Sequence, residues 1–199
     1  MELMKRYPDN HFDLAIVDPP YGIGVTKNKR LNNNSNNDWD SEIPSAEYFN
    51  ELKRVSKNQI IWGGNYFNLP IQRGWIFWDK DIRDGLSFSD GELAWTNFDR
   101  VLKRCFIPYS GFRGADNGGK IHPTQKPIQL YQWLLINYAE PNFKILDTHL
   151  GSGSIAIAVD SVNKIEKMNL TLTACELDRE YYQTATQRIK EQTTWNSLF

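Results

Sequence analysis

The sequence of 199 residues has little cysteine, almost no net charge and no long apolar run. Its two cysteines, Cys105 and Cys175, lie far apart, which argues against a disulfide scaffold and fits a reducing compartment. A net charge of −1 gives no overall basic field to indicate a nucleic-acid partner, although a local basic face would be enough. No signal peptide and no stretch of membrane-spanning length is visible. We therefore expect a soluble cytoplasmic protein with no membrane partner.

Histidine is also scarce. His11, His122 and His149 are the three in the chain, and their spacing gives no reason to expect them to converge. The cysteines lack the short spacing of metal ligands as well. We predict no metal site.

What the chain does have is enough length and enough aromatic residues for a substantial core, and we expect one domain spanning 1–199. Short apolar strands alternate with helical patterns, which is typical of a doubly wound α/β fold with a mostly parallel sheet. Strands are expected at 14–17, 59–62, 75–78, 92–96, 144–147 and 170–174. Helices are expected near residues 2–7, after the capping residues Ser45, Thr124 and Asp178, and after the glycine turn at 151–153.

Two stretches carry no such pattern. The asparagine-rich segment within 26–43 cannot bury apolar surface, so we predict a mobile loop, which is either a lid or a plain surface excursion. The segment 97–121 is mixed in charge and is predicted to be a short irregular insertion.

The most informative motif is Asp18-Pro19-Pro20-Tyr21, which follows an apolar strand. The two prolines stiffen the loop, and the carboxyl end of a buried strand is where open α/β sheets bind their ligands. A carboxylate, bare carbonyls and a ring are suited to a flat nitrogen heterocycle. The alternative is a purely structural turn, in which Asp18 caps and Tyr21 packs.

A second motif is the turn Gly151-Ser152-Gly153, with Glu176 at the end of the next predicted strand. This spacing fits the loose dinucleotide fingerprint and indicates a ribose-bearing cofactor, although a tight turn and a helix-flanking charge would look the same. Asp147, just before the turn, would repel a pyrophosphate but suits the amino group and sulfonium of S-adenosylmethionine.

Taken in order, residues 18–21, 122–127 and 147–154 resemble the motifs of the DNA amino-methyltransferases, in the permuted "beta" arrangement with the catalytic loop first. The stretch 88–95 is similar to that of small phage-type members. The resemblance implies a Rossmann-like, S-adenosylmethionine-dependent enzyme that methylates the exocyclic N6 of adenine in DNA. Transfer would be direct and in line, to a base that is flipped out of a duplex or presented in a single strand.

The same resemblance implies the roles of individual residues. Asp18 and the Pro19 carbonyl would accept the amino hydrogens, Pro19 and Pro20 would keep these acceptors rigid, and Tyr21 would stack on the base. The residues expected to bind the cofactor are Asp18, Thr124, Lys126, Asp147, His149, Gly151, Ser152, Gly153 and Glu176.

Two departures from the family pattern leave alternatives open. Relatives usually begin with one more strand upstream of residues 2–7, so the sheet would lack an edge strand and the chain could be a truncated cofactor-binding remnant. A separate target-recognition region is missing before His122, so selectivity would be weak or would depend on a homodimer or a partner subunit. Cytosine N4 is the alternative target, and a nucleotide-dependent oxidoreductase is the alternative class. Restriction-modification, phage protection and regulatory methylation all stay open.

Overall fold

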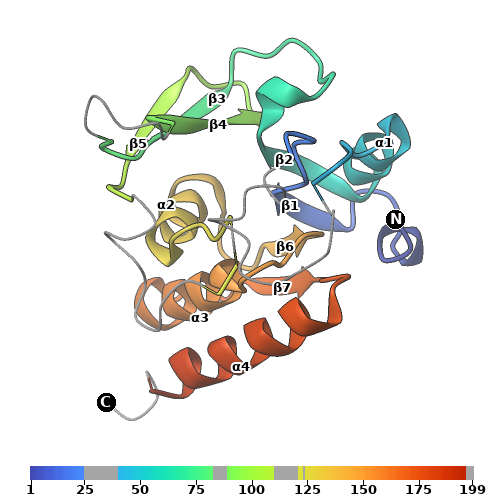
Figure 1. Ribbon diagram of the computed structural model, residues 1–199. Coiled ribbons are helices and arrows are strands. Elements are labelled where there is room, and N and C mark those ends of the chain that lie inside the picture. The colour runs from blue at the N-terminus through green and yellow to red at the C-terminus, as the bar shows by residue number, and fades with distance from the viewer. Residues whose placement is uncertain (25–39, 83–88, 110–120, 123, 196–199) are drawn as a thin grey trace.

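The computed structural model of the chain describes residues 1–24, 40–82, 89–109, 121–122 and 124–195. These residues form one seven-stranded sheet in the order β5-β3-β4-β2-β1-β6-β7 (Figure 1). All neighbouring strands are parallel except that β4 runs antiparallel to both β2 and β3. The expected doubly wound, mostly parallel fold is confirmed. The strands are β1 Phe12–Val17, β2 Ser56–Trp62, β3 Trp75–Asp79, β4 Gly91–Thr96, β5 Lys103–Phe106, β6 Lys144–Asp147 and β7 Thr171–Ala174.

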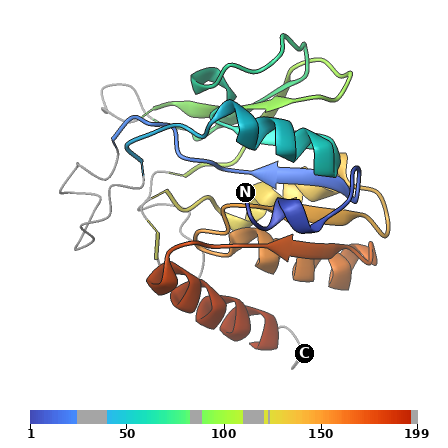
Figure 2. The same cartoon turned by 90° about the vertical axis from the view of Figure 1, so that its right-hand side faces the viewer.

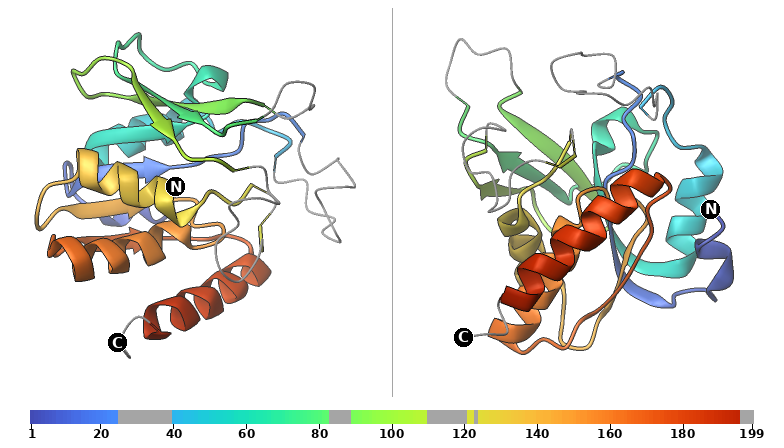
Figure 3. Two further views of the ribbon diagram at one scale, coloured as in Figure 1. Left: turned by 90° about the vertical axis from the view of Figure 1, so that its left-hand side faces the viewer. Right: turned by 60° about the horizontal axis from the view of Figure 1, so that its bottom comes forward.

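Helices cover the two faces of this sheet in layers. Figure 1 shows α2 and α3 on one side, and α1 and the short helix η1 on the other; Figure 2 gives the same layers from the side. The last helix, α4, lies along α3 (Figure 3). The helices are η1 Met4–Arg6, α1 Ala46–Val55, η3 Gly64–Tyr66, α2 Ile128–Tyr138, α3 Ser154–Glu166 and α4 Arg179–Trp195.

The central strand β1 explains why its sequence is apolar without alternation. Leu14 and Ile16 belong to the core cluster beneath α2 and α3, whereas Ala15 and Val17 belong to the cluster beneath α1. Successive side chains of a strand point to opposite faces, and here both faces are covered. Each of these four side chains is at most 1% exposed.

The strand directions bring several chain segments to one edge of the sheet, which we call the carboxyl edge. Strands β1, β2, β3, β5, β6 and β7 all end there, and the antiparallel β4 begins there. Asp18 follows β1, Asp147 is the last residue of β6, and Glu176 lies just beyond β7. The topology therefore places these three acids along a common edge, as the sequence predicted.

Two expectations were wrong. The segment 97–121 is not irregular throughout, because it contains β5; a four-residue edge strand with two charged residues has little pattern to recognise. Thr124 does not cap α2, whose N-cap is Pro127. A residue that precedes proline avoids the helical region, so the helix cannot extend back to Thr124.

The other helix starts agree with the sequence. Ser45 is the N-cap of α1, although its side chain makes no capping hydrogen bond. Asp178 Oδ1 accepts the backbone N–H groups of Glu180 and Tyr181 at the start of α4. The predicted mobile loop 26–43 lies mostly outside the described residues. At its described end, Asp40 is buried.

Candidate active site

The stiff loop after β1 forms the first half of the site. The hydroxyl of Tyr21 donates to Asp18 Oδ1 at 2.7 Å, and Lys126 Nζ donates to Asp18 Oδ2 at 2.6 Å. Lys126 is 3% exposed, so this is a buried ion pair. Three residues that the sequence assigned to the site from two separate motifs are therefore in direct contact.

Two further charged residues complete this arrangement. Glu92, near the start of β4, has Oε2 3.0 Å from Lys126 Nζ and Oε1 2.5 Å from Lys80 Nζ. The Tyr21 hydroxyl is 3.2 Å from Glu92 Oε2. We call Asp18, Tyr21, Lys80, Glu92 and Lys126 the ionic cluster; it contains two acids and two lysines.

Sequence reasoning missed Glu92 and Lys80, and the available signal was weak. An acid at the start of one predicted strand and a lysine just past the end of another both fall at the carboxyl edge. Only the antiparallel pairing of β3 with β4, which sets Trp78 opposite Glu92, brings them together.

Burial and charge compete within the cluster. Burial opposes ionisation of Glu92, but Lys126 and Lys80 outweigh it and lower the pKa of Glu92 to about 2. For Asp18 the burial effect prevails over Lys126, and its pKa is raised. Burial alone would lower the pKa of Lys126, but Asp18 and Glu92 raise it. Glu92 and Lys126 therefore hold their charges at neutral pH.

The ring of Tyr21 lies against Tyr66 and the backbone of Gly63. It stacks on Tyr66 with centroids 5.1 Å apart and an interplanar angle of 16°. Gly63, which follows β2, has a left-handed backbone (φ +67°), and a Cβ there would lie 2.2 Å from Tyr21 Cε1. A side chain at Gly63 would thus collide with the ring. Tyr66 is 45% exposed. The sequence did not identify it as a site residue, and the only signal for it was the glycine pair at 63–64, at the end of a predicted strand.

The backbone of the loop is also anchored. Asp40 Oδ1 accepts the N–H of Tyr21 at 2.9 Å and the N–H of Gly22 at 3.0 Å. Asp40 is 2% exposed. Since a carboxylate with backbone donors fixes a turn firmly, Asp40 is a positioning residue that the sequence alone did not reveal.

The glycine turn after β6 forms the second half of the site, and its two glycines are needed for different reasons. At Gly153 (φ +76°) a Cβ would lie 2.8 Å from Ile189 Cδ1, so this glycine lets α4 pack closely. At Gly151 (φ +53°) a Cβ would meet nothing nearer than 3.8 Å. A Cβ on Gly151 would therefore make only ordinary van der Waals contacts, and because the residue is partly exposed, a ligand can approach its backbone. Ser152 lies between them, and its carbonyl accepts from the buried Arg188 at 2.8 Å.

Acidic side chains flank this turn. Asp147 is 1% exposed, and burial raises its pKa to about 7, with a further rise caused by Asp18. Its Oδ1 accepts the N–H of His149 at 2.9 Å. Glu176 accepts the N–H of Gly151 at 2.8 Å through Oε2. Because a carboxylate oxygen can accept more than one hydrogen bond, both acids keep capacity for a ligand.

His149 is fixed from the α1 side. Thr148 Oγ1 lies 2.7 Å from the Tyr48 hydroxyl and 3.0 Å from His149 Nδ1. Burial lowers the pKa of His149 to about 4, so the ring is neutral at physiological pH.

The segment that contains Thr124 and Lys126 joins the two halves. His122 lies beside the glycine turn, where its Cε1 would be 3.9 Å from a Cβ on Gly151, and its ring packs on Tyr181. Thr124 Oγ1 is 3.2 Å from His122 Nδ1. Two residues later, Lys126 reaches Asp18. Together with the adjacent strands β1 and β6, this segment brings the predicted residues into one region.

The chemistry of the second half fits S-adenosylmethionine. Asp147 is a buried carboxylate suited to an ammonium group, and Glu176 offers acceptors for ribose hydroxyls. A pyrophosphate would be repelled by both acids. The partly exposed backbone at Gly151 lets such a ligand approach.

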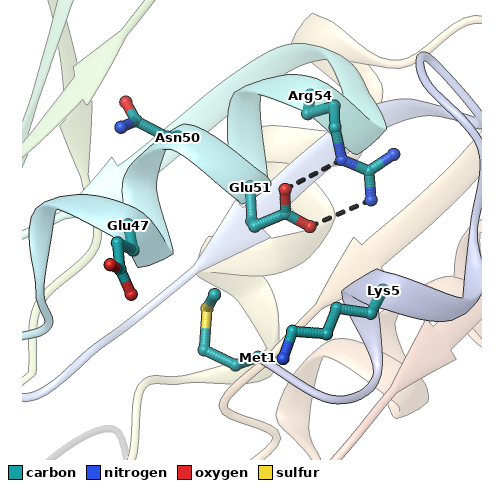
Figure 4. Close-up of a pocket in the computed structure, with 6 residues that line it drawn as sticks. All are labelled: Met1, Lys5, Glu47, Asn50, Glu51 and Arg54. Atoms are coloured by element: carbon teal, nitrogen blue, oxygen red, sulfur yellow. Dashed lines mark hydrogen bonds and ion pairs between the residues drawn. The ribbon is translucent and has the colours of Figure 1, made fainter.

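A separate hollow of about 540 Å³ lies between η1 and α1 (Figure 4). Three of its charged side chains form ion pairs: Arg54 with Glu51 at 2.9 Å, and Lys5 with Glu2 at 3.0 Å. None of the predicted site residues lines it. Within the described ranges, no cluster of three histidine, cysteine or acidic side chains is placed to hold a metal ion, and no helix is long and apolar enough to cross a bilayer.

Comparison with known proteins agrees with this geometry. The profile of the DNA methylase family, whose members act on N6 or N4 amino groups, matches residues 61–187, which is more than half of the chain. The type II methyltransferase M.HpaI of Haemophilus parainfluenzae is 22% identical over 241 residues, covering 96% of this chain and 72% of the relative.

Two solved structures share the fold. M1.HpyAVI in complex with S-adenosylmethionine has a TM-score of 0.60 and 20% identity, covering 94% of both chains. The cytosine-N4-specific PvuII DNA methyltransferase has a TM-score of 0.58 and 13% identity, covering 97% of this chain and 88% of that one. From the profile match and the fold, the chain belongs to the DNA methylase family and is an S-adenosylmethionine-dependent DNA methyltransferase of the N6/N4 type.

Proposed function

We propose that this enzyme methylates the exocyclic N6 of adenine in DNA. The observation that carries the proposal is the Asp18 carboxylate, held in a proline-stiffened loop next to the β6 end at Asp147. A carboxylate at the first position of this loop favours adenine, whereas a serine would favour cytosine. Cytosine N4 is the second candidate, because a cytosine-N4-specific enzyme shares the fold.

The residues at the glycine turn would hold the cofactor. Asp147 would bind its ammonium group, Glu176 its ribose hydroxyls, and the partly exposed backbone at Gly151 would allow close approach. Leu177, 94% exposed beside Glu176, offers an apolar surface for a purine ring. S-adenosylmethionine supplies a methyl group made electrophilic by the sulfonium to which it is bonded. Neighbouring contacts to this ligand are proposed for Thr124, Lys126, His149, Ser152, Gly153 and, at the reacting end, Asp18.

At the reacting end, the target amino nitrogen is a poor nucleophile, and the protein must help it to attack the methyl group. The lone pair of an adenine amino group is delocalised into the ring, so the nitrogen must become pyramidal. Asp18 and the Pro19 carbonyl would accept its two hydrogens, and these acceptors favour the positive charge that develops on nitrogen in the transition state. Pro19 and Pro20 keep them rigid, so little reorganisation is needed.

The base would be held by aromatic stacking. Tyr21 and Tyr66 already form a stacked pair, and we propose that this pair provides the surface for the target ring, with Tyr66 as the more exposed member. Stacking of a base on an aromatic side chain contributes about 1–3 kcal/mol. The target amino group is inaccessible in a stacked duplex, so the base would be flipped out or presented in a single strand.

Other parts of the proposal concern the setting. A DNA substrate fits a cytoplasmic enzyme, and the type II methyltransferases among the relatives favour a role in restriction-modification. The segment 97–121 is too short for a separate target-recognition region. A homodimer or a partner subunit would therefore supply the sequence selectivity.

The test is the identity of the modified nucleoside. Plasmid DNA from a methylation-deficient host is incubated with the protein and labelled S-adenosylmethionine, digested to nucleosides and separated. We expect N6-methyldeoxyadenosine. Label in N4-methyldeoxycytidine would replace the proposal by the second candidate. Binding of S-adenosylhomocysteine without transfer to any DNA would identify a cofactor-binding remnant.

A further inference from the structure

Lys126 contacts Asp18, the residue that the proposed function assigns to the target amino group. Its Nζ lies 2.6 Å from Asp18 Oδ2, and the Tyr21 hydroxyl donates to Oδ1. A target amino group that binds to Oδ2 therefore meets an ammonium group beside it. Because like charges repel, a cation left there would oppose the positive charge that develops on the amino nitrogen.

From this contact we infer that Lys126 is a shared cation which moves from Asp18 towards Glu92 when the target amino group binds, and that Glu92 is the positioning residue that receives it. The inference rests on the proposed function, because it assigns Asp18 to the amino group. It adds a role for Glu92, which neither the motifs nor the comparisons assign.

The contacts of Lys126 allow this movement without leaving a buried charge unpaired. An ammonium group has three donors, and here they face three acceptors: Asp18 Oδ2, Glu92 Oε2 at 3.0 Å and the Tyr21 hydroxyl at 3.2 Å. Two acceptors remain once Asp18 is released. Lysine also has a flexible stem, so a shift of about 1 Å needs no movement of the backbone.

Glu92 is well placed to receive the cation. It lies on a strand, opposite Trp78 in the register of β3 and β4, so its backbone is fixed. Lys80 Nζ contacts its other oxygen and helps to keep it ionised, in line with its lowered pKa. The ring of Trp62, 5.3 Å from Lys126 Nζ, gives the cation a further favourable contact during the shift.

The test compares Glu92→Gln with Glu51→Gln. Glutamine keeps the size of Glu92 and removes its charge. Glu51 is the matched control: its side chain is also 24% exposed and paired with a basic residue, but it lies on α1 away from the carboxyl edge. We expect kcat to fall about 10- to 100-fold in Glu92→Gln, with the KM for the cofactor unchanged within about twofold, since transition-state charge is affected more than binding. Glu51→Gln should match the wild type.

Two further measurements separate positioning from a structural role. Glu92→Asp restores the charge and should recover most of the lost kcat. In the free protein, the ¹³Cε resonance of Lys126 should titrate at lower pH in Glu92→Gln than in the wild type, because one of the two anions that raise the pKa of Lys126 is gone. The other groups near this ammonium group are Asp18 and Tyr21 after β1, Lys80 after β3, which contacts Glu92, and Asp147 at the end of β6.

The outcomes distinguish the two proposals. If Glu92→Gln has the kcat of the wild type, the inference that Lys126 moves to Glu92 is wrong, and the methyltransferase proposal is unaffected. Loss of kcat with no recovery in Glu92→Asp would also overturn the inference. If the wild type transfers no methyl group to DNA, the proposed function fails, and an unchanged Lys126 titration in Glu92→Gln would then reject the shared cation independently.

Discussion

At the end of β1 and the start of β4, the carboxylates of Asp18 and Glu92 are each in contact with a lysine ammonium group. At the ends of β6 and β7, in the other half of the same edge, Asp147 and Glu176 accept backbone N–H groups. The first arrangement balances its charge and holds its acceptors in fixed directions. The second places two acids beside the partly exposed backbone of Gly151. A balanced half suits a neutral amino group, and an acidic half suits a cationic ligand.

The largest expected effect comes from removing Asp18, the proposed acceptor for the target amino group. In Asp18→Ala we expect the rate of methyl transfer to fall about 100- to 1,000-fold, the usual cost of losing one preorganised transition-state contact. Binding of S-adenosylhomocysteine, measured by calorimetry, should change far less, because Asp147 and Glu176 are intact.

Asp18→Asn and Asp99→Ala serve as controls for this experiment. Asp18→Asn keeps the shape of the side chain, so it should fold even if alanine leaves Lys126 too poorly paired. Asp99 is an exposed acid paired with Arg73 at the surface, and its loss should leave the rate unchanged. Near-wild-type activity in both Asp18 variants would contradict the comparison.

The next effect concerns the glycines of the two halves. In Gly63→Ala the new Cβ would collide with the Tyr21 ring in a left-handed backbone, and we expect the free energy of unfolding to fall by about 3 kcal/mol. Gly151→Ala has a similar left-handed backbone, but its Cβ would meet no atom nearer than 3.8 Å, so the expected loss is about 1 kcal/mol. Urea denaturation of both variants measures the difference. Equal losses would show that crowding at Tyr21 is unimportant.

A smaller effect is expected when the acidic half loses its buried charge. In Asp147→Asn, S-adenosylhomocysteine should bind about 30-fold more weakly, which corresponds to about 2 kcal/mol for a lost charge pair. The free energy of unfolding at pH 8 should not fall, because the variant no longer buries an ionised carboxylate. Calorimetry and urea denaturation test both statements. Unaltered affinity would remove Asp147 from the cofactor site.

The smallest effect is a pH dependence of cofactor binding. Since the pKa of Asp147 is about 7 in the free protein, this carboxyl is largely protonated below pH 7. A ligand ammonium group requires the anion, so binding at lower pH must release a proton. Affinity for S-adenosylhomocysteine should therefore rise about fivefold from pH 6 to 7 and about twofold more by pH 8, and level off above pH 8.

The control for this profile is Asp147→Asn, which should give a flat curve between pH 6 and 8. Calorimetry in buffers with different heats of ionisation would count the protons released. A flat profile in the wild type would mean that Asp147 does not pair with the ligand.

Much of the fold could be predicted because its signals are local. The strands β1, β2, β3 and β6 were recognisable as short apolar runs, and α3 began where the glycine turn predicted. β5 was missed because an exposed edge strand needs little apolar sequence. Thr124 resembles a helix cap but is not one, because Pro127 keeps the residue before it out of the helical region.

The site divides in the same way. Asp18, Tyr21, Lys126 and the glycine turn could be found because they form compact motifs. Glu92, Asp40 and Tyr66 could not, since each reaches the Asp18 loop only through tertiary contacts. For Gly153 the residue was anticipated but not its reason: it accommodates Ile189 of α4 and does not serve a ligand alone.

The sequence by itself determined the order of the motifs, the alternation of strands and helices, and the presence of acids at strand ends, since these depend on neighbouring residues. Only the tertiary structure decided which charges meet. Lys126 contacts Asp18 and Glu92 because parallel and antiparallel pairing bring β1, β4 and the segment before α2 to one edge. An interaction between charges depends on distance in space, and the chain order does not set that distance.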